Sequence, residues 1–249
     1  MANSALATLE SALRARNLDR TLTTALPPLE RTDPSAYAPA GLTDLDACLR
    51  SGLPRGQVSE LAGSRSSGRL TLLWRFLAAA TRRGEIAAFI DTLDRLDVAS
   101  AQAAGIDLDR LLWIRGHAMA RAEGDVLERA LDRAIKALSL VVQAGGFGLV
   151  AIDLADVPPV ALKRLPFNTW LRVQRAVEGS DTACVLVGPE PLARSAGGVT
   201  LTLDGRTSWT GEADRSRRLS GVDMQVRVVS PRRRVGGTVP VAATAATGC

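Results

Sequence analysis

The sequence is poor in the residues that form disulfide frameworks and His/Cys metal sites. Its three cysteines, Cys48, Cys184 and Cys249, lie far apart, and its single histidine is His117. This distribution fits neither a set of paired disulfides nor the ligand spacing of a zinc site. The sequence therefore argues against a disulfide-stabilised domain and predicts no bound metal.

Long apolar runs are also missing, and none approaches the roughly 20 residues that a membrane-spanning helix needs. Charged side chains occur throughout the first 26 residues, where a signal peptide would have an apolar segment. We therefore expect a cytoplasmic protein without a membrane partner. With 249 residues, of which 46% are hydrophobic, the chain can form one large core with small appendages.

Positive charge is concentrated near the C-terminus and comes almost wholly from arginine, since Lys136 and Lys163 are the only lysines. Residues 212–249 contain three acidic residues, Glu212, Asp214 and Asp223, and seven arginines: Arg215, Arg217, Arg218, Arg227, Arg232, Arg233 and Arg234. Seven positive charges less three negative ones give +4 of the formal net charge of +5. Attraction to nucleic acid should therefore be strongest at this end.

Four regions follow from the pattern along the chain. Residues 1–41 combine an amphipathic helix, with Leu6, Leu9 and Leu13 at helical spacing, and an extended linker rich in proline. Residues 42–211 form the core, residues 212–235 a basic strand and tail, and residues 236–249, which lack an amphipathic period, a disordered end.

In the core, apolar strands and helices alternate. The strands are expected at Val58–Ala62, Ala87–Asp91, Leu111–Ile114, Leu149–Asp153 and Ala183–Val187. The helices are expected at Thr43–Leu49, Thr71–Arg82, Val98–Ala104, Glu123–Gln143 and Val160–Val177, the last with a break at Pro166. This order predicts an α/β fold with a mostly parallel sheet flanked by helices.

The pattern changes after residue 198, where polar and apolar residues alternate over Val199–Leu203, Ser208–Thr210 and Val222–Val229. Asp204-Gly205 is a dipeptide that favours a hairpin turn. We therefore expect antiparallel strands on the C-terminal side of the sheet.

A glycine-rich loop follows the first core strand: Gly63, Ser64, Arg65, Ser66, Ser67, Gly68, Arg69 and Leu70. Its glycine spacing matches a phosphate-binding loop, which needs lysine and then serine or threonine after the second glycine. Here Arg69 replaces the lysine, and Leu70 removes the hydroxyl that would hold magnesium. The loop alone leaves three interpretations open: a tight turn without ligand, weak nucleotide or anion binding, or hydrolysis.

The residues around this loop are more specific. Gly52-Leu53-Pro54-Arg55-Gly56 precedes the first strand, Ser66-Ser67-Gly68 opens the helix, and Arg83-Gly84-Glu85 precedes Ala88-Phe89-Ile90-Asp91. Together with Gly105-Ile106-Asp107-Leu108-Asp109, this series resembles the RecA family, closely from Leu42 to Asp153 and more loosely to Leu203. The resemblance implies a RecA-like, phosphate-loop NTPase-like core.

The resemblance also implies that the ATPase site is degenerate. Leu93 stands where the family has the glutamate that activates water, and Gly188-Pro189 stands where it has the glutamine that senses nucleotide. Asp153 still matches the acidic residue of the Walker B strand. We therefore expect no enzymatic activity and no cofactor, with weak nucleotide or anion binding at the loop left open.

The DNA-binding parts of the family look reduced as well. The segments that match its DNA-holding loops, Ala155–Lys163 and Glu190–Val199, are short and contain only Lys163 and Arg194 as basic residues. A degenerate core of this length resembles the RecA-like accessory proteins (ImuA) of the bacterial mutagenesis cassette. This implies a non-catalytic role in translesion synthesis, with an inactive Y-family polymerase-like adaptor, RecA and single-stranded or damaged DNA as partners. It also implies association with the nucleoid when the protein is on DNA. The alternatives are a slow DNA-dependent nucleotide hydrolase that uses Arg69 and Asp153, and a regulator of RecA filaments.

Individual residues leave further alternatives open. The C-terminal arginines can bind DNA or an acidic partner, or form a solvated tail, and deletion of residues 212–249 is expected to weaken DNA binding. Trp209 can stack on a base or anchor a partner, or it can pack in the sheet, which we expect. Leu6, Leu9 and Leu13 can dock on another subunit or on RecA, or pack on their own core. Core packing is expected for Trp74, Trp113, Trp170 and Cys184.

Overall fold

A computed structural model describes residues 33–116, 124–166, 168–193, 198–212, 215–230 and 238–244. The chain divides into two compact units, residues 1–34 and 35–249, and the following description concerns the second. The arm residues Leu6, Leu9 and Leu13 lie outside the described residues, as do His117, Arg194, Arg232, Arg233 and Arg234. Within the described part, no helix has the length and apolar character needed to cross a membrane.

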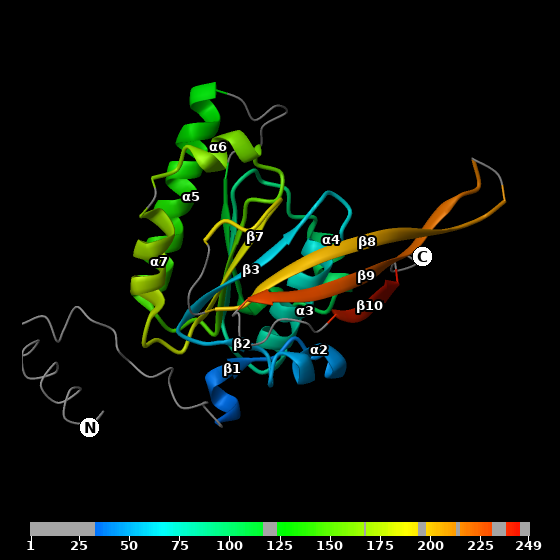
Figure 1. Cartoon of the computed structure of the whole chain (residues 1–249), viewed down its shortest axis with the longest axis horizontal. Helices are drawn as coiled ribbons and strands as arrows, with labels where there is room; N and C mark the ends of the chain where they lie inside the picture. The colour runs from blue at the N-terminus through cyan, green and yellow to red at the C-terminus, as the bar shows by residue number, and fades with distance from the viewer. Residues whose placement is uncertain are drawn as a thin grey trace, which may run out of the picture. The chain divides into compact units, whose positions relative to one another are not determined.

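An eight-stranded sheet forms the centre of this unit, in the order β10-β9-β8-β3-β7-β6-β4-β5 (Figure 1). Its strands are β3 (Gln57–Gly63), β4 (Ala87–Asp91), β5 (Leu111–Arg115), β6 (Leu149–Asp153), β7 (Ala183–Gly188), β8 (Thr200–Thr210), β9 (Arg218–Ser230) and β10 (Thr238–Thr244). The six strands from β8 to β5 are parallel, whereas β9 and β10 pair antiparallel. This confirms the predicted mostly parallel sheet with antiparallel strands on its C-terminal side.

Helices cover both faces of the parallel sheet. They are α2 (Thr43–Cys48), α3 (Arg69–Arg82), α4 (Val98–Ala103), α5 (Gly124–Ala144), α6 (Pro159–Lys163) and α7 (Thr169–Val177). Short 3₁₀ helices, Pro34–Ala36 and Leu108–Arg110, and a two-stranded sheet of β1 (Tyr37–Ala38) and β2 (Leu53–Pro54) complete the described elements. Helices α6 and α7 are separated near Pro166, as expected from the proline.

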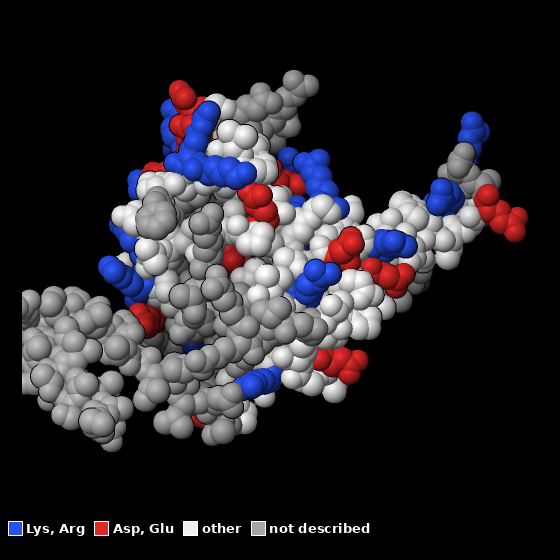
Figure 2. Space-filling model, in the orientation of Figure 1, with Lys and Arg blue, Asp and Glu red and all other residues white. Residues whose placement is uncertain are grey.

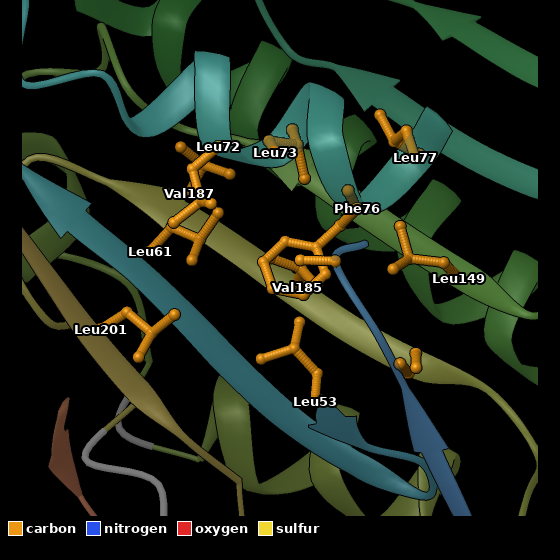
Figure 3. Close-up of a cluster of buried hydrophobic side chains, with 14 of the residues drawn as sticks. Leu53, Leu61, Leu72, Leu73, Phe76, Leu77, Leu149, Val185, Val187 and Leu201 are labelled. Carbon is orange, nitrogen blue, oxygen red and sulfur yellow. The ribbon is translucent and has the colours of Figure 1, made fainter. Parts of the chain in front are cut away.

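Two apolar clusters hold the layers together because successive strand residues point to opposite faces. On one face, α3 places Leu72, Leu73, Phe76 and Leu77 against Val185, Val187 and Leu149 (Figure 3). On the other face, α5 and α7 pack Leu131, Leu138 and Val173 against the strands. We call the first group the α3 cluster and the second the α5–α7 cluster. Trp74 makes an edge-to-face contact with Phe89, and Trp113 and Trp170 pack against these clusters, as expected.

The hairpin turn predicted at Asp204-Gly205 is wrong. Strand β8 continues through both residues, which pair with Gln225 and Met224, and the chain reverses only between Thr210 and Arg218. A Cβ at position 205 would lie 2.6 Å from the backbone oxygen of Ser67. Glycine is therefore needed here for close approach of two backbones, not for a turn.

The disordered end predicted over residues 236–249 is also wrong for Thr238–Thr244, which form β10. Val239 and Val241 are buried and pack into the α3 cluster, while Thr238, Pro240 and Ala242, which alternate with them, are exposed. Pro240 is compatible with a strand because β10 is at the edge of the sheet. The C-terminal strands therefore belong to the main sheet.

Candidate functional site

The glycine-rich loop connects β3 to α3 and lies at the C-terminal ends of the parallel strands. Gly68, which precedes α3, has φ of +86°, a conformation that favours glycine. A side chain at position 68 would also overlap the side chain of Met224 on β9. The loop therefore has the expected strand–turn–helix setting, and part of its surface is covered by the β8–β9 pair.

Arg69, at the position of the missing lysine, is turned toward the interior and is only 6% exposed. Its guanidinium donates hydrogen bonds to the carbonyl oxygens of Ala155, at 2.8 Å, Gly188, at 3.4 Å, and Gly63. Gly63 and Gly188 end β3 and β7, and Ala155 follows the end of β6, so Arg69 joins three neighbouring strand ends. Burial lowers the pKa of this guanidinium, an effect that the nearby Asp153 and Asp156 oppose.

Asp153 lies at the end of β6, close enough to Arg69 for electrostatic interaction. Its carboxylate accepts a hydrogen bond of 2.8 Å from the backbone N–H of Ala155. Burial raises the pKa of Asp153 to about 6, and the neighbouring carboxylates Asp91 and Asp156 add to the increase while Arg69 opposes it. The structure thus brings together the predicted loop arginine and the predicted strand-end acid.

Leu70 contributes no polar side-chain atom to the loop, and its side chain packs against the α3 cluster. The side-chain hydroxyl of Ser67 is buried and has no hydrogen-bond partner within the described residues. Leu93, at the position of the expected water-activating acid, is 5% exposed and belongs to the α5–α7 cluster. Of the two positions where the family places polar groups, one is therefore part of the core and the other packs against it.

Asp91, at the end of β4, is buried and fully engaged in holding its own loop. It accepts hydrogen bonds of 2.8 Å from the backbone N–H groups of Arg95 and Leu96 and one of 3.2 Å from the indole of Trp113. Sequence reasoning did not single out this residue for such a role. An acidic residue at the end of an apolar strand was the available signal.

Glu60, in the middle of β3, was also missed. This carboxylate is 2% exposed and accepts hydrogen bonds from the backbone N–H groups of Leu192, at 2.6 Å, and Ala193, at 2.5 Å, and from the hydroxyl of Thr200 at 3.1 Å. It thereby ties the connection between β7 and β8 to the sheet. A charged residue inside an otherwise apolar strand was the signal for an anchoring role.

The second predicted site lies on the β8–β9 ribbon. Strand β8 pairs with β3 only over Thr200–Leu203, and its remaining residues pair only with β9, so the two strands extend beyond the parallel sheet (Figure 1). Basic and acidic side chains alternate along this extension (Figure 2). Of the predicted binding arginines, the structure describes four exposed ones on β9 or in the preceding turn: Arg215, Arg217, Arg218 and Arg227.

Trp209, near the tip of this ribbon, is 50% exposed, so the expectation that it packs in the sheet is wrong. Its indole N–H donates to the hydroxyl of Thr207 at 3.0 Å, and the guanidinium of Arg217 lies 5.7 Å from its ring centroid. Leu219, 44% exposed, is its cross-strand partner. Trp209 lies where few core atoms remain to cover it, and an indole, an apolar side chain and an arginine share the tip.

The C-terminal strands also contain core residues, which changes the meaning of the deletion of residues 212–249. Met224, Val226 and Val228 on β9 are each no more than 2% exposed. Their loss would open the core near the loop. The contribution of the arginines to binding therefore has to be measured with point substitutions.

Comparison with known proteins gives a consistent result. The model of the family described as the RecA N-terminal domain matches residues 29–160, more than half of the chain. Proteins named Protein RecA are similar to it: that of Clavibacter michiganensis is 40% identical over 121 residues, and that of Mycobacteroides abscessus is 38% identical over 125. These matches cover 48% and 50% of this chain but only 30% and 33% of the relatives. The chain is thus similar to less than half of those proteins, and on its matched residues and its fold it belongs to the RecA N-terminal domain family.

Proposed function

We propose that this protein is a non-catalytic RecA-like accessory in translesion DNA synthesis after DNA damage. It acts by binding rather than by hydrolysis, with a polymerase-like adaptor, RecA and DNA as its partners. Family membership supports the broader part of this proposal, a role related to DNA repair or recombination. The observation that carries the non-catalytic part is the arrangement of Arg69.

The arrangement of the described residues supports the non-catalytic part of the proposal. Phosphoryl transfer needs a cation on the terminal phosphates, a hydroxyl and an acid on the metal, and a group that positions water. Arg69 is directed to backbone carbonyls, Leu93 is in the core, Leu70 packs against the core, and Pro189 follows β7. Asp153 alone keeps a family group, and a single buried carboxylate supports no hydrolysis.

The β8–β9 ribbon supports the binding part of the proposal. An exposed indole beside an arginine offers a nucleic-acid base both stacking and cation–π contacts. Such an anchor also suits a protein interface, where tryptophan and arginine contribute disproportionately to affinity. We assign the exposed arginines Arg215, Arg217, Arg218 and Arg227 to the same role, together with Arg232, Arg233 and Arg234, which lie outside the described residues.

ATP turnover of the whole chain, measured with and without single-stranded DNA, tests the non-catalytic assignment. A RecA protein serves as the positive control, and turnover at the level of the buffer blank is expected. Turnover that DNA stimulates and that the Asp153→Ala substitution abolishes would show an enzyme instead.

Co-purification with the adaptor and with RecA tests the accessory role. We expect the wild-type chain to retain the adaptor, and the Trp209→Ala/Arg217→Ala variant to retain it less well. Binding to RecA filaments without any adaptor complex would favour a regulator of recombination over this proposal.

A further inference from the structure

The central feature of the loop is the guanidinium of Arg69, a cation whose hydrogen-bond acceptors are backbone carbonyl oxygens of the protein itself. Arg69 is the first residue of α3, and its guanidinium donates hydrogen bonds to the carbonyl oxygens of Gly63, Ala155 and Gly188. One of these bonds is made by the Nη2 atom and two by Nη1. The guanidinium therefore connects the ends of β3 and β7 with Ala155, two residues after the end of β6, and these three strands are consecutive neighbours in the sheet.

A guanidinium suits this position in a way that an ammonium does not. It is planar, it keeps its charge in proteins, and its five N–H groups can serve several carbonyls at once in a fixed geometry. Carbonyl oxygens at the ends of parallel strands attract a cation, and the carboxylate of Asp156 lies 3.9 Å from Nη2 of Arg69. A buried carbonyl without a hydrogen-bond donor costs free energy of folding, so these hydrogen bonds stabilise the folded chain.

The same contacts connect the loop to the segment that follows β6. Arg65, whose side chain is 84% exposed, forms an ion pair of 3.3 Å with Asp156, and Ala155 accepts from Arg69. Two residues of the glycine-rich loop therefore contact the start of the Ala155–Lys163 segment. No ligand is needed for this connection.

We propose that Arg69 is an internal ligand that holds the ends of β3, β6 and β7 together, so that the loop keeps one arrangement and does not accept a nucleoside triphosphate. This goes beyond the lack of hydrolysis, because it assigns the loop a structural role and excludes binding as well. It does not depend on the adaptor, RecA or DNA.

Thermal unfolding of the full chain tests the first part of this inference. The pair Arg69→Met and Arg69→Lys is compared with Arg65→Met and Arg65→Lys, matched substitutions on the same loop at an exposed side chain. Arg69→Met should lower Tm by about 8 °C, because two buried carbonyls and one partly buried carbonyl lose this donor, whereas Arg65→Met should lower it by about 1 °C. Arg69→Lys should also lower Tm more than Arg65→Lys. Equal effects at the two positions would overturn the inference.

Ligand addition to the wild-type chain tests the second part and requires no variant to fold. Magnesium ATP at millimolar concentration should leave Tm unchanged, since only a ligand that binds the folded state stabilises it. A rise of several degrees would contradict the exclusion of nucleotide.

Hydrogen exchange distinguishes a connection between strands from a local effect on the loop. In the Arg69→Lys variant, amide exchange should rise together at residues 63–70, 154–157 and 187–190, and it should stay unchanged in Arg65→Lys. A rise confined to residues 63–70 would show that Arg69 stabilises the loop alone. Because DNA and partner proteins are absent from these measurements, their outcome is independent of the proposed accessory function.

Discussion

Two arginines with different surroundings show how the glycine-rich loop and the β8–β9 ribbon differ. Arg69 is buried, and its donors point to backbone carbonyls, whereas Arg217 is exposed and lies over the ring of Trp209. The first guanidinium contributes to the fold, and the second remains available to a partner. Matching a family motif therefore does not decide which of its residues is functional, since the orientation and burial of each side chain decide it.

The largest effect should come from removing a glycine that the loop and the ribbon both require. Gly68→Ala places a Cβ onto Met224 in a left-handed conformation, and we expect it to lower the free energy of unfolding by about 3 kcal/mol. Gly84→Ala is the matched control, because Gly84 has a similar φ of +84° but nothing within 4 Å of the added atom. It should cost only about 1 kcal/mol of left-handed strain in urea unfolding. Equal losses would mean that Met224 does not hold the ribbon on the loop.

A loss of about 2–3 kcal/mol is expected for Glu60→Ala, which removes the acceptor for three donors. Glu60→Gln keeps an oxygen acceptor and should recover part of the stability. Urea unfolding gives the values, and proteolysis after Leu192 or Ala193 should become faster in the alanine variant. An unchanged cleavage rate would show that Glu60 does not anchor this connection.

The pH dependence of the free energy of unfolding tests the surroundings of Asp153. Its pKa rises from an ordinary value of 3.8 to about 6 in the folded chain, so the folded state binds this proton more tightly than the unfolded state. Stability from this group is therefore present at pH 4 and is lost as pH rises through 6. Asp153→Asn removes the buried charge and should stabilise the chain by roughly 2 kcal/mol at pH 7.5, with little difference at pH 4.

Urea unfolding at both pH values checks this expectation, with Asp156→Asn as a half-exposed control that should change stability by less than about 1 kcal/mol. Destabilisation by Asp153→Asn at pH 7.5 would mean that attraction to Arg69 outweighs the cost of burial.

The smallest effect on stability is expected at the ribbon tip. Trp209→Ala should change the free energy of unfolding by less than about 1 kcal/mol, because half of the side chain is already exposed. The same substitution should weaken single-stranded DNA binding by about 1–3 kcal/mol, the usual contribution of a stacked base. Trp74→Ala is the opposite case, since its ring packs on Phe89 and its loss should destabilise the fold. A strong loss of stability with Trp209→Ala would place that residue in the core after all.

The sequence predicted the parallel part of the fold well. The bounds of β4 and β6 agree with the structure, because continuous apolar runs between turn residues leave little choice of register. The C-terminal part was predicted less well. Asp204-Gly205 has turn chemistry, but contact with Ser67 determines its conformation, and the alternation at Val239 and Val241 is too short to stand out from a tail rich in alanine and threonine.

For the candidate site, the sequence predicted that Arg69 and Asp153 belong together, but it did not predict the contacts that each side chain makes. Position 69 was recognised as arginine in place of lysine, yet only the structure shows that this arginine points inward. Glu60 accepts from backbone N–H groups of a distant segment and Asp91 from those of its own loop, so an acidic residue in or after an apolar strand marks each position without specifying its partners. Exposure of Trp209 follows from the length of the ribbon, and the wrong turn position concealed that length.

Single-stranded DNA binding, measured by fluorescence anisotropy with and without magnesium ATP, tests most directly the division between a structural loop and a binding ribbon. Wild-type protein should bind DNA with the same affinity in both conditions, and the Arg215→Ala/Arg217→Ala/Arg218→Ala variant should bind more weakly and with a smaller salt dependence. Binding that requires magnesium ATP, or that is unchanged in the triple variant, would contradict this account.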